Sequence, residues 1–153
     1  EVRLAQATGR PLSIAFVDLD HFKAINDTHG HADGDQCLRI LCQRVTSHTR
    51  HRDILGRFGG DELLILMPDT PLDDAFALAN GIREDFAARP MTIAGLLIQT
   101  SLSIGVAELQ PGEDAQAVVE RADAALYASK NAGRDRVTVA SQQLKGAASA
   151  CPV

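Results

Sequence analysis

Two adjacent glycines followed by two adjacent carboxylates, Gly59-Gly60-Asp61-Glu62, form the segment best suited to chemistry. Short apolar stretches, Ile54-Leu55 and Leu63 to Met67, lie on either side of it. Two strand-like stretches around a Gly-Gly pair predict a β-hairpin, because tight hairpin turns need positive φ angles, which glycine adopts at no steric cost. Two carboxylates on such a support can bind a hard cation such as Mg²⁺. The alternative is an ordinary turn whose polar residues face water.

A further acid, Asp18, ends a predicted buried strand over residues 12–18. If this strand pairs with the hairpin, Asp18 and Asp61 come together, and neighbouring carboxylates favour a bound cation. Asp20 fits the cap of the helix that follows, but capping does not account for Asp18. His29 and His31 have the spacing of two zinc ligands, yet without a third ligand in view we do not expect a zinc site.

Three further segments have both a binding and a structural interpretation. Asn26-Asp27 and Asp35 suit the recognition of a purine edge, since an amide offers a donor and an acceptor together, but turn and cap chemistry also explains them. Lys130 and Arg134 end the last predicted helix, where cations can meet phosphates or simply favour the helix dipole. The segment from Arg50 to Asp53 fits a solvated run of charge.

The composition of the 153 residues excludes some classes of function. A formal net charge of −5 argues against binding of nucleic acid, which needs a basic surface. The odd set of Cys37, Cys42 and Cys151 lacks metal-ligand spacing and favours a reduced, cytoplasmic compartment. No apolar run is long enough to insert this chain into a membrane. Because the chain begins at Glu1 without a methionine, we expect a piece of a longer protein, which could itself be membrane-anchored.

The positioning elements follow the order βααββαβαβ. This order, with one hairpin among longer connections, predicts an α+β fold: a mixed, mostly antiparallel sheet that helices cover on one face. We expect one domain over residues 1–140 and a loosely ordered tail over 141–153. The predicted strands are near 12–18, 53–58, 62–67, 97–106 and 136–140, and the predicted helices are near 20–28, from Asp33 towards Arg50, from Pro71 to before Pro90, and near 114–131.

Local signals define two of these helices more closely. Asp33 and Gln36 have the spacing of a capping box at the start of the second helix. Pro71 suits the first helical position of the third, where its missing N–H has no cost. A buried stripe on that third helix is predicted at Leu72, Phe76, Ala79, Ile82 and Phe86.

Four segments in order closely resemble the GGDEF domain of diguanylate cyclases: Asp18 to Asp27, Gly30 to Asp35, Arg57 to Leu63, and Lys130 to Arg134. The match extends over about residues 11–140. The resemblance implies a palm-like α+β fold similar to that of nucleotide cyclases and polymerases. It also implies condensation of two GTP molecules into cyclic di-GMP with release of pyrophosphate.

The resemblance further implies roles for particular residues. Asp18, the backbone carbonyl of Leu19 and Asp61 would hold Mg²⁺, or Mn²⁺ in its place. Asp61 would also accept the proton of the attacking 3′-hydroxyl, Glu62 would support the same site, and Lys23 would steady the transition state. The expected substrate contacts are Asn26, His31 and Asp35 on guanine and ribose, and the backbone around Phe22 with Lys23, Lys130 and Arg134 on the phosphates.

Because each domain of this kind holds one GTP, catalysis implies a homodimer. The family's inhibitory product site matches Arg50-x-x-Asp53, where arginine can bind a guanine edge through two hydrogen bonds. We therefore predict that cyclic di-GMP binds at Arg50 and Asp53 and restrains the enzyme.

The sequence departs from the family pattern at two places. Leu63 replaces the final phenylalanine of the signature, and we expect it to pack inward. The usual lead-in before the first helix is absent, which suggests that a sensory or dimerising region is missing and that isolated activity is low. Two alternatives to an active cyclase remain open. One is a silent module that binds cyclic di-GMP or a protein, and the other is a cyclase of single nucleotides, which would lack the pattern from Asn26 to Asp35.

Overall fold

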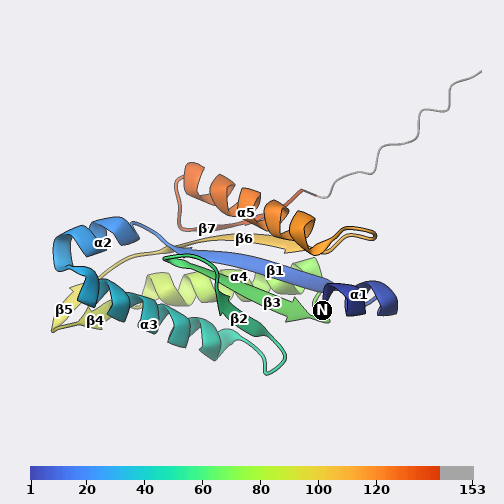
Figure 1. Ribbon diagram of the computed structural model, residues 1–153. Coiled ribbons are helices and arrows are strands. Elements are labelled where there is room, and N and C mark those ends of the chain that lie inside the picture. The colour runs from blue at the N-terminus through green and yellow to red at the C-terminus, as the bar shows by residue number, and fades with distance from the viewer. Residues whose placement is uncertain (142–153) are drawn as a thin grey trace, which may run out of the picture.

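The computed structural model describes residues 1–141, so the predicted tail lies outside the described residues except for residue 141. Figure 1 shows the arrangement of the elements. In chain order they are α1 (Val2–Thr8), β1 (Leu12–Leu19), α2 (Phe22–His29), α3 (His31–His48), β2 (Ile54–Arg57), β3 (Glu62–Pro68), α4 (Leu72–Ala88), β4 (Met91–Ile93), β5 (Leu96–Ile98), β6 (Leu102–Glu108), α5 (Ala115–Asn131) and β7 (Arg136–Val139).

A five-stranded sheet in the order β2-β3-β1-β6-β7 forms the centre of the molecule. The pairs that involve β1, β2 and β3 are antiparallel, as is the β1–β6 pair, whereas β6 and β7 run parallel. The α+β fold with a mixed, mostly antiparallel sheet is therefore confirmed. The strand at the centre, β1, is buried along its whole length, which explains its nearly continuous apolar sequence.

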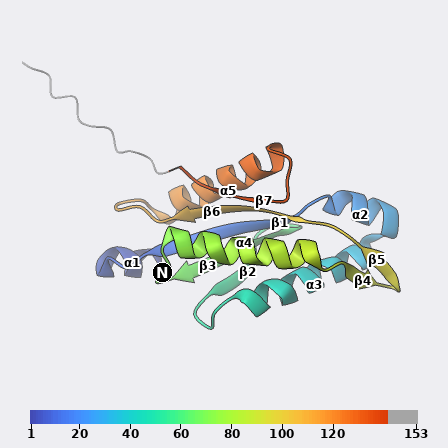
Figure 2. The ribbon, with the colours of Figure 1, turned by 180° about the vertical axis from the view of Figure 1, so that it is seen from behind.

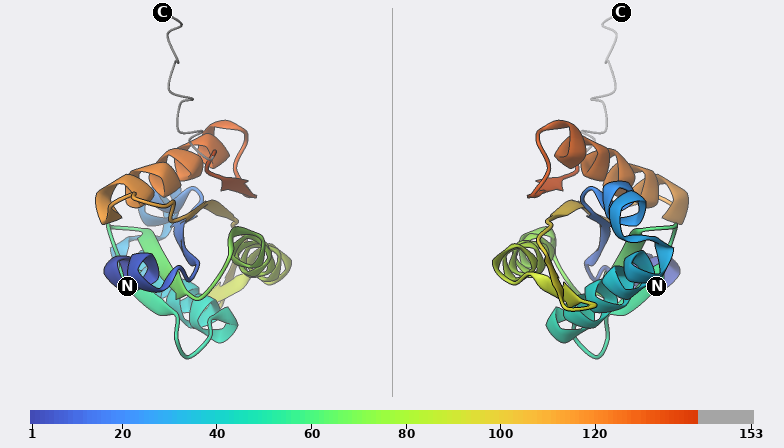
Figure 3. Two further views of the ribbon diagram at one scale, coloured as in Figure 1. Left: turned by 90° about the vertical axis from the view of Figure 1, so that its right-hand side faces the viewer. Right: turned by 90° about the vertical axis from the view of Figure 1, so that its left-hand side faces the viewer.

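Helices cover both faces of this sheet, so the prediction of a single covered face is wrong. Side chains of β1 alternate between the faces. Ala15 and Val17 pack in a core with α3 and α4, while Ile14 and Phe16 pack in a second core with α5. The end-on views of Figure 3 show α5 on one side of the sheet and the other long helices opposite, and in Figure 2, which views the molecule from behind, α4 lies in front of the sheet.

One close approach explains how α5 lies on the sheet. A Cβ atom at Gly105 in β6 would overlap the backbone of α5 at Ala122 and Leu126. Glycine at this position therefore lets the helix backbone pack directly on the strand. The predicted helix near 114–131 is confirmed, and the Asp114 side chain caps it by accepting from the N–H of Ala117.

The predicted strand over 97–106 is wrong, because this segment belongs to two sheets. Residues up to Ile98 close a separate β4–β5 hairpin, and β6 begins only at Leu102. The hairpin turns at Ala94 and Gly95, both with positive φ. Periodicity alone did not separate the two strands, since both are apolar. Helix α1 was not predicted from the sequence.

The predicted helix starts are wrong in detail. Helix α3 begins at His31 and has Gly30 as its N-cap, so Asp33 lies within the first turn and no capping box forms. Pro71 precedes α4 as its N-cap, and the N–H of Leu72 donates to Glu108 Oε2 over 2.7 Å. The buried stripe of α4 contains Ala75 in place of Phe76, which is 40% exposed.

Two smaller observations complete the fold. Cys37 and Cys42 are free thiols, as expected from their poor geometry for a disulfide, whereas Cys151 lies outside the described residues. Among residues 1–141, no helix combines the length and the apolar character that crossing a membrane requires.

Candidate active site

Strand pairing brings the conspicuous acids of the sequence together. Strands β1 and β3 run antiparallel with Asp18 directly opposite Glu62, and Asp61 immediately precedes β3. The expected pairing of the first strand with the hairpin is thus confirmed. The register thus sets Asp18 and Glu62, which are far apart in the sequence, side by side at one end of the sheet, and the adjacent Asp61 lies close enough to act on the charge of Asp18.

The hairpin between β2 and β3 turns through a loop over residues 58–61. The N–H groups of Phe58 and Gly59 both donate to the carbonyl of Glu62, at 3.0 and 3.4 Å. Neither Gly59 nor Gly60 has a positive φ, so the predicted reason for the two glycines is wrong. A Cβ atom at Gly59 would lie 2.8 Å from Glu62 Oε2, so a larger residue there would displace the end of the Glu62 side chain.

The exposed side chain of Arg57, at the end of β2, holds this loop, and the sequence did not predict this role. Its Nε donates to the carbonyls of Gly59 and Gly60 at 3.2 and 3.1 Å, and its Nη2 donates to Gly60 as well. An arginine that precedes a glycine-rich turn is the available signal for such a contact. The side chain of Leu63, which follows the acids, packs inward and is 2% exposed, as expected.

Asp18 is a buried carboxylate with incomplete charge compensation. Only 4% of the residue is exposed, and Lys130 Nζ donates to its Oδ2 over 2.7 Å. Burial raises the pKa of Asp18 to about 6, against the lowering effect of Lys130, and the nearby charges of Asp61 and Glu62 raise it further. Of the charges that act on Asp18, only Lys130 is positive, whereas Asp61 and Glu62 are negative, so the charge of Asp18 is not fully compensated.

The donor set fits a hard divalent cation only in part. Carboxylate oxygens are suitable ligands for Mg²⁺, and a cation would relieve the excess negative charge around Asp18. Within residues 1–141, however, no group of three or more His, Cys, Asp and Glu side chains is placed to hold a metal ion. A cation here would therefore need other oxygen ligands, such as the Leu19 carbonyl or a bound phosphate.

Helices α2 and α3 bring Asn26 next to Gly34. The Oδ1 atom of Asn26 is buried without a hydrogen-bond partner, and a Cβ atom at Gly34 would overlap it. The same Cβ atom would lie 3.3 Å from the ring of Phe22. An unpartnered buried acceptor is costly, so it favours a ligand that donates to it. Gly34 was missed as a site residue, although a glycine inside a helix is an unfavourable choice that calls for a reason.

The remaining predicted nucleotide contacts lie around this end of the sheet. Asp35 and Asp61 line one surface pocket of about 440 Å³. His31 and Lys23 lie exposed in the first turns of α3 and α2. Arg134 is exposed just after α5 and has a φ of 64°.

Asp20 is not the cap of α2, so that prediction is wrong. It is 1% exposed, and its carboxylate accepts from the hydroxyls of Ser101 and Ser103, both at 2.6 Å, and from the N–H of Asp135 at 3.1 Å. The N-cap of α2 is His21, which has a φ of 60° and makes no capping bond with its side chain. The Asp20 carboxylate, which local spacing predicted as the cap of α2, therefore binds donors that are distant in the sequence instead.

Arg50 and Asp53 form a closed turn between α3 and β2. The N–H of Arg50 donates to Asp53 Oδ2 over 2.7 Å, and the N–H of Asp53 donates back to the carbonyl of Arg50 over 3.0 Å. Arg50 is exposed. The turn precedes β2, whereas the acidic loop follows it, so the length of that strand separates the two candidate sites.

Comparison with known families assigns the chain. A family model described as the GGDEF domain of diguanylate cyclases matches residues 1–136. The chain belongs to this family. Among curated relatives, it is 40% identical to the diguanylate cyclase DgcP of Pseudomonas aeruginosa over 92% of its own length, and 40% identical to the response regulator PleD of Caulobacter vibrioides over 89%.

Solved GGDEF domains have the same fold. The GGDEF domain of DgcB from Caulobacter crescentus, in complex with c-di-GMP, superposes with a TM-score of 0.86 at 35% identity, over 90% of this chain and 82% of that one. The active GGEEF domain of a diguanylate cyclase from Vibrio cholerae gives a TM-score of 0.85 at 35% identity, over 92% and 89%. The chain spans only 21% of DgcP and 31% of PleD, so it corresponds to one part of those proteins.

Proposed function

We propose that this GGDEF domain is a diguanylate cyclase that condenses two GTP molecules into cyclic di-GMP and two pyrophosphates. The observation that carries the proposal is the meeting of Asp18, Asp61 and Glu62 at the end of β1 and β3. A phosphoryl-transfer site has little covalent chemistry to perform, so it needs placed charge and placed substrates, which this arrangement can supply.

In each of two condensation steps, the 3′-hydroxyl of one GTP attacks the α-phosphorus of the other. A new phosphodiester bond forms, the bond to the β-phosphate oxygen breaks, and pyrophosphate leaves. Asp61 accepts the proton of the attacking hydroxyl and Glu62 supports the site. Asp18, the Leu19 carbonyl and Asp61 would hold Mg²⁺ or Mn²⁺, which when bound lowers the pKa of the hydroxyl and neutralises phosphate charge.

The substrate is bound by groups on α2, α3 and the end of α5. Asn26 and Asp35 contact the guanine, with Gly34 leaving the space that the Asn26 amide occupies. His31 contacts the ribose. The backbone at Phe22, with Lys23, Lys130 and Arg134, contacts the phosphates.

Lys130 has two roles in this proposal. Without substrate it is the counter-ion of Asp18, at 2.7 Å. If Asp18 held a divalent cation, its charge would be compensated without Lys130, and the lysine side chain, which is 30% exposed, would be free to reach a phosphate.

Two copies must face each other, since each site holds one GTP, and we propose a homodimer as the active form. Cyclic di-GMP binds at Arg50 and Asp53 and restrains the enzyme. An Arg50→Ala variant tests this second site by calorimetry: weaker binding of cyclic di-GMP with an unchanged affinity for GTP is expected. Unchanged product affinity would contradict the assignment.

The decisive test of activity incubates concentrated protein with GTP and Mg²⁺ and detects cyclic di-GMP by liquid chromatography and mass spectrometry. A second sample carries an N-terminal coiled coil that enforces a dimer. Product from the parent sequence, but not from an Asp61→Ala control, is expected. If even the enforced dimer forms no product while it still binds cyclic di-GMP, the domain is a binding module and not an enzyme.

A further inference from the structure

The turn that carries Arg134 has an unusual backbone. Gly133, Arg134 and Asp135 follow α5 with φ angles of 108°, 64° and 44°. Left-handed conformations cost a residue with a side chain roughly 1–2 kcal/mol, and such residues persist where the surroundings hold them. Two consecutive non-glycine residues in this region therefore call for contacts that fix them.

Asp20, just after β1, supplies the first of these contacts. Its Oδ2 accepts the N–H of Asp135 at 3.1 Å and the Ser101 hydroxyl at 2.6 Å, and its Oδ1 accepts the Ser103 hydroxyl at 2.6 Å. The Asp20 backbone is held as well, because its N–H donates to the Ser101 carbonyl and its carbonyl accepts from Thr100 Oγ1. Both carboxylate oxygens are thus occupied by donors of the protein, so Asp20 is not a free ligand for a cation.

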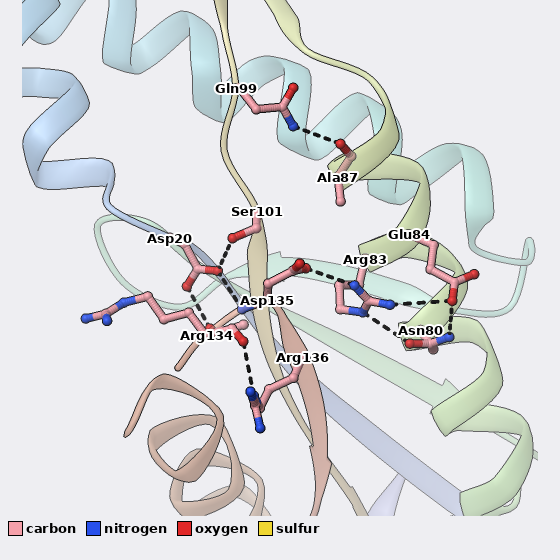
Figure 4. Close-up of polar contacts among 11 residues, drawn as sticks. Asp20, Asn80, Arg83, Glu84, Ala87, Gln99, Ser101, Arg134, Asp135 and Arg136 are labelled. Atoms are coloured by element: carbon pink, nitrogen blue, oxygen red, sulfur yellow. Dashed lines mark hydrogen bonds and ion pairs between the residues drawn. The ribbon is translucent and has the colours of Figure 1, made fainter. Parts of the chain in front are cut away.

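Arg83 of α4 holds the same turn from the side, as Figure 4 shows. Its Nη1 donates to Asp135 Oδ1 over 2.9 Å, and its Nε donates to Asn80 Oδ1 over 3.1 Å. The Arg83 side chain is only 19% exposed, which keeps its geometry restricted. Asp135 is therefore bound through its backbone by Asp20 and through its side chain by Arg83.

This double attachment leaves the neighbouring side chain of Arg134 directed away from α4 (Figure 4). The backbone of Arg134 is fixed at both ends, since its N–H donates to the Ser129 carbonyl at 3.0 Å and its carbonyl accepts from Arg136 Nε at 3.1 Å. Asp20 also lies two residues after Asp18 on the same chain segment. One buried residue thus connects the end of β1, where the acids meet, to the turn that presents Arg134.

We propose that Asp20 is a positioning residue that acts through Asp135 to hold Arg134 in the orientation in which it meets a phosphate of the substrate. This role depends on the proposed function, in which Arg134 is a phosphate contact. A purely structural Asp20 would affect folding alone, whereas a positioning Asp20 affects binding of the triphosphate and depends on the presence of Arg134.

The test measures the affinity of a non-hydrolysable GTP analogue and of guanosine for the parent chain, Asp20→Asn, Arg134→Ala and the double variant. Asp20→Asn is expected to weaken binding of the analogue by about tenfold, in line with the loss of one charge-assisted contact, and to leave guanosine unaffected. In the Arg134→Ala background, Asp20→Asn is expected to have no further effect, since residues that act in series are not additive. Asp74→Asn, an exposed aspartate on α4, is the matched control.

A second variant covers the case in which Asp20→Asn fails to fold. Arg83→Met leaves the exposed side chain of Asp135 without its partner but keeps the buried Asp20 carboxylate in place. This variant is therefore expected to fold and to weaken binding of the analogue by about two- to fivefold, again only when Arg134 is present. Additive losses in either cycle, or an equal loss of guanosine affinity, would overturn the positioning role. If Arg134→Ala binds the analogue as the parent does, the phosphate role of Arg134 in the proposed function also fails.

Discussion

Within residues 1–141, two ion pairs attach α5 to neighbouring segments, one near each end of the helix, and their carboxylates differ in pKa in opposite directions. Arg121 donates to both oxygens of Glu113, at 2.6 and 2.7 Å, and Glu113 also accepts the N–H of Gln110. These donors lower the pKa of Glu113, with the Arg121 hydrogen bonds as the largest cause. Lys130 pairs with Asp18 over a similar 2.7 Å, yet burial raises the pKa of Asp18 to about 6.

The difference lies in the number of donors around each carboxylate. Glu113 has a donor on each oxygen, and the two side chains of its pair are 12% and 10% exposed, so this pair is complete as a structural contact. Asp18 has one lysine and two further acids beside it, Asp61 and Glu62. A carboxylate that the protein leaves short of positive charge is suited to receive a cation, whereas a saturated one is not.

The largest effect, on the rate of cyclic di-GMP formation, is expected when Asp61 is removed from the site around Asp18. Asp61→Asn keeps the size of the side chain but removes the proposed cation ligand and proton acceptor, so the rate of cyclic di-GMP formation should fall by at least about a thousandfold. The free energy of unfolding should stay constant or rise slightly, because a charge that repels Asp18 is gone. Glu113→Gln is the matched control, and its folded form should turn over normally. If Asp61→Asn formed cyclic di-GMP at the rate of the parent chain, the proposed difference between the Asp18 site and the Glu113 pair would be contradicted.

The next largest effect, on the free energy of unfolding, concerns the pair of Arg121 and Glu113. Arg121→Met leaves Glu113 buried without its partner and should lower the free energy of unfolding by about 3 kcal/mol. Urea denaturation measures this loss, and turnover per folded molecule should be unchanged. A stability loss below about 1 kcal/mol would show that the pair is not the stabilising contact that its geometry indicates.

The two carboxylates should also give stability profiles of opposite sign with pH. The raised pKa of Asp18 means that the folded state binds its proton more tightly than the unfolded chain, where the pKa is near 3.8. Stability from this group is therefore greatest below that value and is lost, by about 1–3 kcal/mol, as the pH rises through about 6. The lowered pKa of Glu113 does the reverse, since its contribution is present above its ordinary pKa of 4.5 and is lost as the pH falls below it.

Urea titrations at several pH values without divalent cations measure both slopes. Asp18→Asn should remove the first slope and Glu113→Gln the second. Added Mg²⁺ should restore stability above about pH 6 in the parent but not in Asp18→Asn, because a ligand of the folded state stabilises it by mass action. Slopes of the same sign for the two groups would remove the contrast between the pairs.

The smallest effect on the free energy of unfolding is expected for Lys130→Met. Below about pH 6, Asp18 can take up a proton when its partner is removed, so the loss of unfolding free energy should stay under about 1 kcal/mol. Arg121→Met, measured under the same conditions, is the comparison. Equal losses for the two variants would show that the ion pairs are equivalent after all.

Much of the fold follows from local pattern. The mostly apolar segment over residues 12–18 identified β1, and the apolar periodicities of α3, α4 and α5 identified three helices. The apolar character of Leu63, in place of the signature phenylalanine, also predicted that it packs inward, and it is 2% exposed. The boundary between β5 and β6, the helix caps and Phe76 were predicted wrongly, because each depends on neighbours that are distant in the sequence.

The sequence by itself determined which residue types could form a site and in what order they occur, since motifs and periodicity are properties of the local chain. The tertiary structure alone decided how these residues are used. The antiparallel register set Asp18 opposite Glu62. Burial raised the pKa of Asp18, whereas the donors around Glu113 lowered its pKa. The Asp20 carboxylate accepts hydrogen bonds from Ser101, Ser103 and Asp135 instead of capping α2. Hydrogen bonds and desolvation act between residues that are far apart along the chain, and only the folded arrangement brings them together.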